Sequence, residues 1–229
     1  KQLFSPQDMN EYDNLFYVKF LKGSSNTQFD CYHNTPPRYE LYIEEITREI
    51  VSITNSSSIL SKVSRADADL NRKIDEKNKD AITEYRQTLK KILQKKEEPE
   101  KPHLHIIIHG MRDRENKDIE IGTRNSTLAT PQITTWFIQA MKENFKNFKI
   151  AIDEEFKGSP ILKHHKYGDK YHEGFGENHN IFQVELSKTL REKHPQLVIE
   201  CLSEIAKEFE EKFCKKTISR DELLQSQPL

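Results

Sequence analysis

The segment His103–Gly110 constrains the fold of this chain most strongly, because it reads His-Leu-His-Ile-Ile-Ile-His-Gly. Three consecutive isoleucines are typical of a strand that is buried on both faces of a parallel sheet. The glycine suits the point at which such a strand opens into a loop. Shorter apolar runs at 16–21, 59–64, 148–152 and 181–186 are interpreted as further strands. These runs predict a central sheet.

Apolar residues also recur at helical spacing along the chain. They predict amphipathic helices at 38–53, 74–98, 131–147 and 195–213. Strands that alternate with helices predict an α/β fold with a mostly parallel or mixed central sheet and helices on both faces. We expect one domain over residues 1–229, with a poorly defined start at 1–35 and a polar tail at 215–229.

Charge and composition exclude several classes of protein. The 36 basic and 37 acidic residues give a formal net charge of −1, whereas a general nucleic-acid binder needs a clear basic excess. No apolar run approaches the roughly 18 residues that span a bilayer, and no signal peptide is recognisable. Three cysteines without CxxC spacing argue against a disulfide framework or a cysteine-rich zinc site. We therefore expect a cytoplasmic protein without nucleic-acid or membrane partners.

Ligands of open α/β sheets bind at the carboxyl ends of the strands, so residues that follow a strand are site candidates. The segment Arg65–Arg72 follows the run at 59–64. The planar guanidinium of Arg72 suits a carboxylate ligand, and Asn71 can share the same ligand group. Taken alone, however, the segment is better explained as a surface loop with local Asp–Arg pairs.

His109 ends the strand of three isoleucines, where a cleft is expected to open. Neutral histidine is a common zinc ligand, so His109 is a candidate for metal binding. On position alone, a histidine that caps the strand end is the favoured alternative. His103 and His105 share the strand face of His109 but are interpreted as surface or core residues.

Glu185 lies within the apolar run Ile181–Leu186. A buried carboxylate is costly unless it is paired or functional. Burial raises the pKa of such a group, which makes Glu185 a candidate general base. The alternative is a glutamate that faces solvent on an edge strand. The apolar neighbours Phe182, Val184 and Leu186 favour the interior position.

Taken together and in order, these motifs resemble the N-formylglutamate amidohydrolase family. The motifs are Asp69-Leu-Asn-Arg72, His109-Gly110, Asp118-Ile-Glu-Ile-Gly-Thr123, Phe156-Lys-Gly-Ser159 and Phe182-Gln-Val-Glu185. The resemblance covers roughly residues 38–213, and the order and spacing are more specific than any single motif. The family shares its zinc-exopeptidase-like fold with zinc carboxypeptidases and N-acetylmuramoyl-L-alanine amidases.

The resemblance implies a zinc-dependent amidohydrolase that cleaves a small acidic N-acylated substrate such as N-formylglutamate. It implies that His109 is a zinc ligand and that Arg72, with Asn71, holds the substrate carboxylate. It also implies that Glu185 activates the zinc-bound water.

Further residues are implied by the same resemblance. Asp118 and Gly122 match a turn that supports the site. Gly158 and one of His164 and His165 match a loop that borders the site, so these two histidines are predicted substrate contacts. A cation near the zinc is expected to stabilise the oxyanion. The candidates for that cation are Arg112, Arg114 and Arg124.

The sequence departs from the family pattern near its start. The family opens with a Pro-His-Gly-Gly-like turn after its first strand, which supplies another metal ligand with an acidic ligand nearby. The corresponding stretch, taken as Phe16–Asn26, contains no histidine. Asp30 and His33 follow and can substitute, although their spacing does not require it. Otherwise the turn lies upstream of Lys1, or the chain binds metal weakly or not at all.

Three functions therefore stay open. The first is hydrolysis of N-formylglutamate or a similar amide, and the second is a zinc carboxypeptidase or N-acetylmuramoyl-L-alanine amidase activity. The third is a degenerate relative that binds an acidic ligand without hydrolysing it. The sequence does not predict the oligomeric state.

Overall fold

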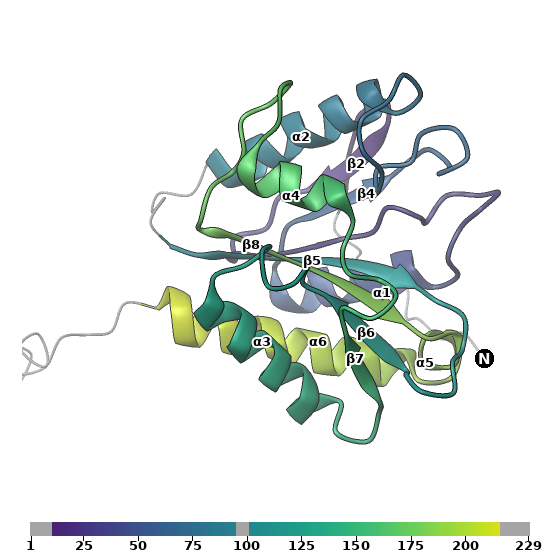
Figure 1. Cartoon of the computed structure of the whole chain (residues 1–229), viewed down its shortest axis with the longest axis vertical. Helices are drawn as coiled ribbons and strands as arrows, with labels where there is room; N and C mark the ends of the chain where they lie inside the picture. Colours follow the sequence, from purple (N-terminus) through teal and green to yellow (C-terminus); the bar gives the residue numbers. More distant parts are fainter. Residues whose placement is uncertain (1–10, 95–100, 216–229) are drawn as a thin grey trace, which may run out of the picture.

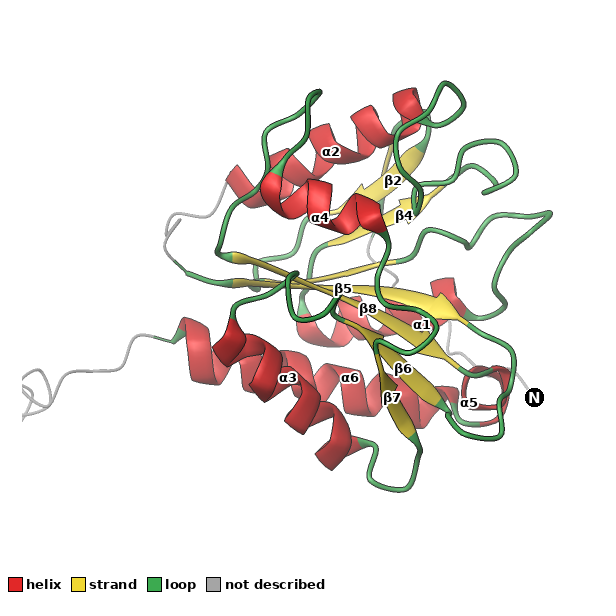
Figure 2. Cartoon of the chain, in the orientation of Figure 1, coloured by secondary structure: helices red, strands yellow, loops and turns green. Residues whose placement is uncertain are grey.

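The structure, a computed structural model, describes residues 11–94 and 101–215. Its central sheet has the strand order β3-β5-β8-β6-β7. Figure 2 shows β5, β8, β6 and β7 of this sheet side by side. Strands β3, β5 and β8 run parallel, whereas β6 is antiparallel to β8 and parallel to β7. The predicted mostly parallel or mixed sheet is confirmed. The strands are β3 (Thr27–Asp30), β5 (His103–Gly110), β6 (Ile119–Gly122), β7 (Ile150–Ile152) and β8 (His179–Leu186).

A second sheet contains three antiparallel strands, β1 (Asp13–Asn14), β2 (Val18–Leu21) and β4 (Ser58–Ser61). Two parallel bridges join β4 and the residue before it to the β3 region, Gln28 to Ser57 and Cys31 to Leu60. The strand expected at 16–21 therefore belongs to this smaller sheet. The first strand of the central sheet is β3, whose side chains are polar except for Phe29, and it was not predicted.

Helices cover both faces of the central sheet, as the sequence predicted (Figure 1). Helices α1, α3 and α6 pack on one face, and α2 and α4 pack on the other. The helices are α1 (Ile43–Thr54), α2 (Lys79–Gln94), α3 (Pro131–Asn144), α4 (Pro160–Tyr167), α5 (Lys188–Lys193) and α6 (Pro195–Phe209), with a π-helical turn at Glu210–Cys214. Within the described ranges, no helix combines the length and apolar character needed to cross a membrane.

Two helices begin later than their periodicity predicts. The residues before them form loops at one edge of the sheet. Tyr42 has a left-handed backbone (φ 67°), so α1 begins at Ile43 and not at residue 38. The side chains of Asp75 and Asn78 bond to backbone groups of the turn that precedes α2. Both delayed starts matter, because residues 33–42 and 62–78 form the loops that surround the site.

The strands of the central sheet present different side chains to the two helical layers. On β5, Leu104, Ile106 and Ile108 join the core beneath α1, α3 and α6. The alternate residues of β5, among them His105 and His109, face α2 and α4. Glu185 on β8 shares that face, because its register partner is His109. The sheet therefore places both candidate residues side by side.

Candidate metal centre and cleft

A cleft of about 1220 Å3 opens at the carboxyl ends of β3, β5 and β8. Its walls are the loops that follow β3 and β4, the segment after β5 and the start of α4. His109 and Glu185 lie on its floor, and Asn71 and Arg72 line one wall. The structure thus brings together four of the residues that the sequence singled out.

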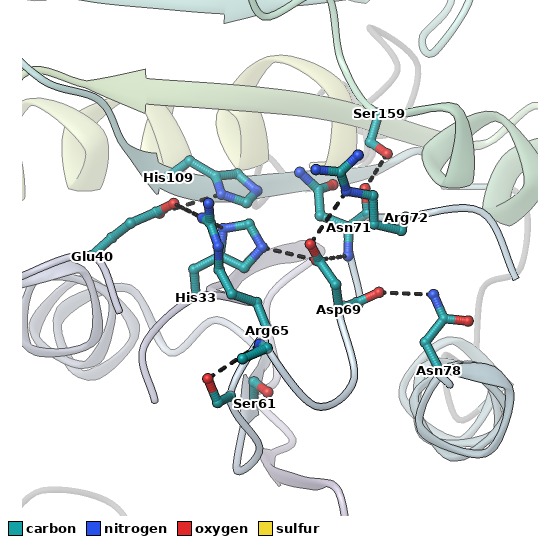
Figure 3. Close-up of polar contacts among 12 residues, drawn as sticks. His33, Glu40, Ser61, Arg65, Asp69, Asn71, Arg72, Asn78, His109 and Ser159 are labelled. Carbon is teal, nitrogen blue, oxygen red and sulfur yellow. Dashed lines mark hydrogen bonds and ion pairs between the residues drawn. The ribbon is translucent and has the colours of Figure 1, made fainter. Parts of the chain in front are cut away.

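Three side chains converge within this cleft. His33, Glu40 and His109 each offer one ligand atom, and these atoms all lie within 4.8 Å of one another. His33 Nδ1 lies 2.8 Å from Glu40 Oε1, and His109 Nδ1 lies 3.4 Å from Glu40 Oε2. Figure 3 shows the three side chains facing one another. We call His33, Glu40 and His109 the metal group.

The metal group is assembled from two parallel strands and one loop. His33 follows β3, His109 ends β5, and Glu40 comes from the loop before α1. The backbone nitrogen of Gly110 donates to Glu40 Oε2 at 2.8 Å, which ties that loop to the end of β5. The backbone nitrogen of Glu40 also donates to the carbonyl oxygen of His33. The positions of the three side chains are therefore fixed by backbone contacts.

Asp69 orients His33 within the group. His33 Nε2 donates to Asp69 Oδ1 at 2.9 Å, because a carboxylate can only accept. Nδ1 of the neutral ring is then left with a lone pair, which accepts from Arg65 Nη1 at 2.9 Å, whereas only the protonated ring can donate from Nδ1 to Glu40 Oε1. A carboxylate behind a histidine in this way is the usual support of a metal-ligating imidazole. Asp69 also accepts from the backbone of Asn71 and lies 3.4 Å from Arg72 Nε.

The donor set fits zinc, which takes imidazole nitrogen and carboxylate oxygen and has three protein ligands in catalytic sites. Two further observations support a metal ion at this place. Nη1 of Arg65 lies 2.9 Å from both His33 Nδ1 and Glu40 Oε1, so a cation already contacts two donors. Nε2 of His109 is buried and has no hydrogen-bond partner among the described residues.

The electrostatics of the group keep Glu40 ionised. Burial alone would raise the pKa of Glu40, but the imidazoles of His109 and His33 hold the pKa well below its usual range. Burial lowers the pKa of His33, but the hydrogen bonds to Asp69 and Glu40 raise it by more, so the net pKa lies above its usual value. Glu40 therefore keeps its negative charge beside the two imidazoles.

Glu185 is a second reactive side chain in the cleft, beside the metal group. It is 4% exposed, and Gln183 Nε2 donates to its Oε1 at 2.8 Å. Burial raises the pKa of Glu185, and the nearby Glu40 raises it further, while His109 lowers it. A carboxylate in such surroundings is a stronger base than one in water. Gln183 in turn accepts from the backbone of Ser159.

Arg72 offers a cation to whatever enters the cleft. Its side chain is 75% exposed, and its one ion pair within the described ranges is the 3.4 Å contact with Asp69. The neighbouring Asn71 has a buried Oδ1 without a hydrogen-bond partner among the described residues. Its carbonyl oxygen accepts from Ser159 Oγ. This wall suits an anionic ligand group.

The structure does not bring the two predicted substrate histidines to the cleft. His165 is 1% exposed, and its ring packs 5.2 Å from that of Tyr85. His164 faces Asp169 on the outer side of α4. Residues 160–167 are helical, and neither histidine of this helix lines the cleft.

Other predicted residues divide in the same way. Arg112 and Arg114 line the cleft, whereas Arg124 does not and instead donates to the carbonyl oxygen of Gly158. Residues 119–122 form strand β6 and not a turn. Glu40 was missed, because the helical pattern extended over it. The signal that could have found it is an acidic residue shortly after His33.

Comparisons with known proteins agree with this geometry. Similar solved structures include an N-formylglutamate amidohydrolase from Ralstonia eutropha JMP134, with a TM-score of 0.59 and 13% identity over 85% of this chain and 98% of that one. A metallo-carboxypeptidase from Burkholderia cenocepacia has a TM-score of 0.53 and 14% identity over 85% and 61%. A bacteriophage poly-gamma-glutamate hydrolase has a TM-score of 0.54 and 13% identity over 85% and 90%. The fold is therefore zinc-exopeptidase-like, as predicted.

The sequence itself also resembles this family. Residues 79–191 match the model of the N-formylglutamate amidohydrolase family, so the predicted resemblance to that family is confirmed. No curated protein sequence matches the chain. The matched segment contains His109 and Glu185, while His33, Glu40 and Arg72 precede it. The family match supports an amidohydrolase.

Proposed function

We propose that this protein is a zinc-dependent amidohydrolase that cleaves the amide of a small acidic N-acylated substrate such as N-formylglutamate. The observation that carries the proposal is the convergence of the metal group, with Glu185 beside it in the same cleft. The family match over 79–191 supports the reaction class. The name of the similar Ralstonia structure supports the substrate.

In this proposal His33, Glu40 and His109 hold the zinc ion. Bound zinc would polarise the amide carbonyl and acidify a water molecule. Glu185 accepts the proton that the attacking water loses and delivers it to the leaving amine. The burial of Glu185 supports this role, because the raised pKa of the carboxyl makes it a better proton acceptor.

Two arginines have separate tasks. Arg72 binds the carboxylate of the substrate, since its guanidinium is exposed to the cleft. Arg65 contacts His33 Nδ1 and Glu40 Oε1, the atoms that a metal would take. We therefore expect Arg65 to release both atoms when metal binds and to donate to the substrate oxygen that gains negative charge. Arg65 thus replaces Arg124 among the candidate oxyanion cations.

The first experiment is the zinc content of the purified protein and of His109→Ala, with turnover of N-formylglutamate measured in parallel. Close to one zinc per wild-type chain, lost in the variant together with turnover, is the expected result. Turnover of a peptide or muropeptide, without N-formylglutamate, would favour the carboxypeptidase or amidase alternative. Absence of zinc in both proteins would leave a binding protein whose anchor is Arg72.

A substrate with several carboxylates is a second candidate, because the cleft is both large and cationic. Arg38, Lys73 and Arg112 line it and form no ion pair with the described residues. Its volume of about 1220 Å3 exceeds the roughly 300–1,000 Å3 of ordinary small-molecule sites. One similar structure is that of a poly-gamma-glutamate hydrolase.

The two substrates can be distinguished by Arg112→Ala. If oligomers are substrates, kcat/KM for a glutamyl oligomer falls by about tenfold or more, because a charge-assisted contact contributes roughly 1.5–3 kcal/mol. The value for N-formylglutamate stays near that of the wild type. If Arg112→Ala has the wild-type kcat/KM for the glutamyl oligomer as well as for N-formylglutamate, the second candidate is removed.

A further inference from the structure

Arg191 is a buried cation beside the cleft to which no role has yet been given. It lies in α5, and its side chain is 5% exposed. Nε donates to the carbonyl oxygen of Leu186 at 3.1 Å, and Nη2 donates to that of Met111 at 3.1 Å. Nη1 donates to the carbonyl oxygen of Leu41. One guanidinium therefore binds three separate segments of the chain.

These three segments carry the chemistry of the cleft. Leu186 directly follows Glu185, and Leu41 directly follows Glu40. Met111 comes two residues after His109. A guanidinium is planar and holds its donors in a rigid fork, so it fixes the relative positions of the groups that it binds. Arg191 thus sets the spacing between the candidate base and two members of the metal group.

Gly110 makes room for this arrangement. A Cβ atom at Gly110 would lie 2.6 Å from Arg191 Cζ and 2.8 Å from Nε, so any side chain there would displace the guanidinium. The same glycine donates its backbone N–H to Glu40 Oε2. The His-Gly pair at the end of β5 therefore serves both the metal group and the guanidinium behind it.

The guanidinium lies in a costly position. Among the residues that the structure describes, no carboxylate lies within 4.0 Å of it, so three carbonyl oxygens are its hydrogen-bond partners. Burial lowers the pKa of Arg191, and the more distant negative charges of Glu40, Glu192, Glu185 and Asp113 offset this effect only in part. A neutral or apolar side chain would fill this space at lower cost if packing were its purpose. The three bonds point instead to control of geometry.

We propose that Arg191 is the positioning residue that holds the metal group and Glu185 in register, although it touches neither metal nor substrate. The inference rests on the proposed metal site. Supporting groups of this kind preorganise ligands so that binding energy is not lost in arranging them.

The test is Arg191→Lys, which keeps a positive charge and similar length but cannot span three carbonyl oxygens. We expect zinc affinity, measured by competition with a chelator, to fall by about 10–100-fold, as for other supporting residues of metal sites. We expect kcat to fall and KM for the acidic substrate to stay nearly constant, because Arg72 is not disturbed. Circular dichroism at the assay temperature shows whether the variant is folded.

Arg86→Lys is the matched control. Arg86 is 3% exposed, and its guanidinium donates to the carbonyl oxygens of His164, His172 and Glu173, far from the metal group in sequence and contacts. This variant loses a similar set of bonds to carbonyl oxygens, although the lysine can keep the ion pair that Arg86 forms with Asp169. Stability is therefore expected to fall while zinc affinity and kcat stay near wild type. If Arg191→Lys does not fold, Arg191→Gln, which retains a planar donor, takes its place.

The outcomes separate the two proposals. Tight zinc binding by the wild type and by Arg86→Lys, with weakened binding by the Arg191 variant, supports the inference. Zinc affinity and kcat within twofold of wild type in the Arg191 variant would overturn it and leave the proposed function intact. A wild-type protein that binds no zinc would remove the proposed function and this inference with it.

Discussion

The two faces of the central sheet differ in chemistry although the same strands form both. On the face of α1, α3 and α6, strands β5 and β8 present Leu, Ile, Phe and Val side chains that are fully buried. On the face of α2 and α4, the same strands present His103, His105, His109, Gln183 and Glu185, interleaved with Ile107 and Ile181 of a second apolar cluster. Strand alternation thus gives one face an apolar core and the other a mixture of apolar packing and the polar residues of the site.

The polar face is nevertheless buried, and hydrogen bonds compensate for that burial. His105 Nε2 lies 2.9 Å from Asp30 Oδ2, and Tyr85 Oη donates to the same oxygen at 2.7 Å. Tyr32 Oη donates to Tyr85 Oη, and its ring lies 5.9 Å from that of His109. A network of this kind makes the polar face specific in structure, whereas the apolar face supplies packing. Substitutions on the two faces should therefore have different consequences.

Glu185→Gln tests the polar face with the largest expected effect. The amide keeps the shape of the side chain but cannot accept a proton, so kcat should fall by about 10²–10⁴-fold, the range of general-base catalysis. Zinc content should stay unchanged. Steady-state kinetics and elemental analysis measure both quantities.

Glu120→Gln is the control for that substitution, because Glu120 is a buried carboxylate opposite Glu185 on β6 and is paired with Lys117. We expect this control to lose stability and to retain kcat within a few-fold. A Glu185→Gln variant with wild-type turnover would remove Glu185 from the mechanism.

Phe182→Ala tests the apolar face on the same strand. The ring of Phe182 stacks on Phe137 with centroids 4.0 Å apart, and its loss leaves a cavity that costs about 3–5 kcal/mol of unfolding free energy. Because the side chain points away from the cleft, zinc content and kcat should stay near wild type at temperatures where the variant is folded. Denaturant unfolding measures the first effect. Loss of zinc with unchanged stability would contradict the division between the faces.

His165→Phe addresses the cost of burial on the polar face and has the smallest expected effect. Burial, and then the charge of Arg86, hold the pKa of His165 well below its usual range. Below about pH 6.5, His165 therefore binds a proton in the unfolded chain but not in the folded protein. The free energy of unfolding decreases as the pH falls through this range.

The phenylalanine variant has no such group, so its melting temperature should decrease less than that of the wild type between pH 7.5 and 5.5. His194→Gln, at an exposed position, is the control and should retain the wild-type dependence. A His165→Phe variant with the wild-type dependence would show that His165 does not carry the effect.

The parts of the fold that could be predicted from the sequence are those in which apolar residues mark the structure. His103–Gly110 and Ile181–Leu186 are strands because nearly every position is buried, and His109 and Glu185 could be recognised within them. Strand β3 could not, because Gln28 and Asp30 belong to the polar network and interrupt any apolar pattern.

The site was less predictable because its members meet through tertiary structure. The predicted Asn71 and Arg72 do line the cleft, yet Glu40 depends on a loop that helical periodicity concealed. His164 and His165 come after the motif Phe156–Ser159, but they lie on a helix. The orientation of that helix determines where their side chains point, and the motif does not predict this orientation. The residues that orient others, Asp69 and Arg191, act through contacts between segments far apart in the chain.

The metal group also has a consequence for folding, because His33, which follows β3, and His109, at the end of β5, are brought together by the parallel pairing of these two strands. The unfolded chain does not present the three donors together. A metal that binds the folded state alone stabilises it by mass action, by about 2.7 kcal/mol at a free concentration of 100 times Kd. The resistance of this protein to heat is therefore expected to follow the zinc concentration of its surroundings, and a chelator should act on it as a mild denaturant.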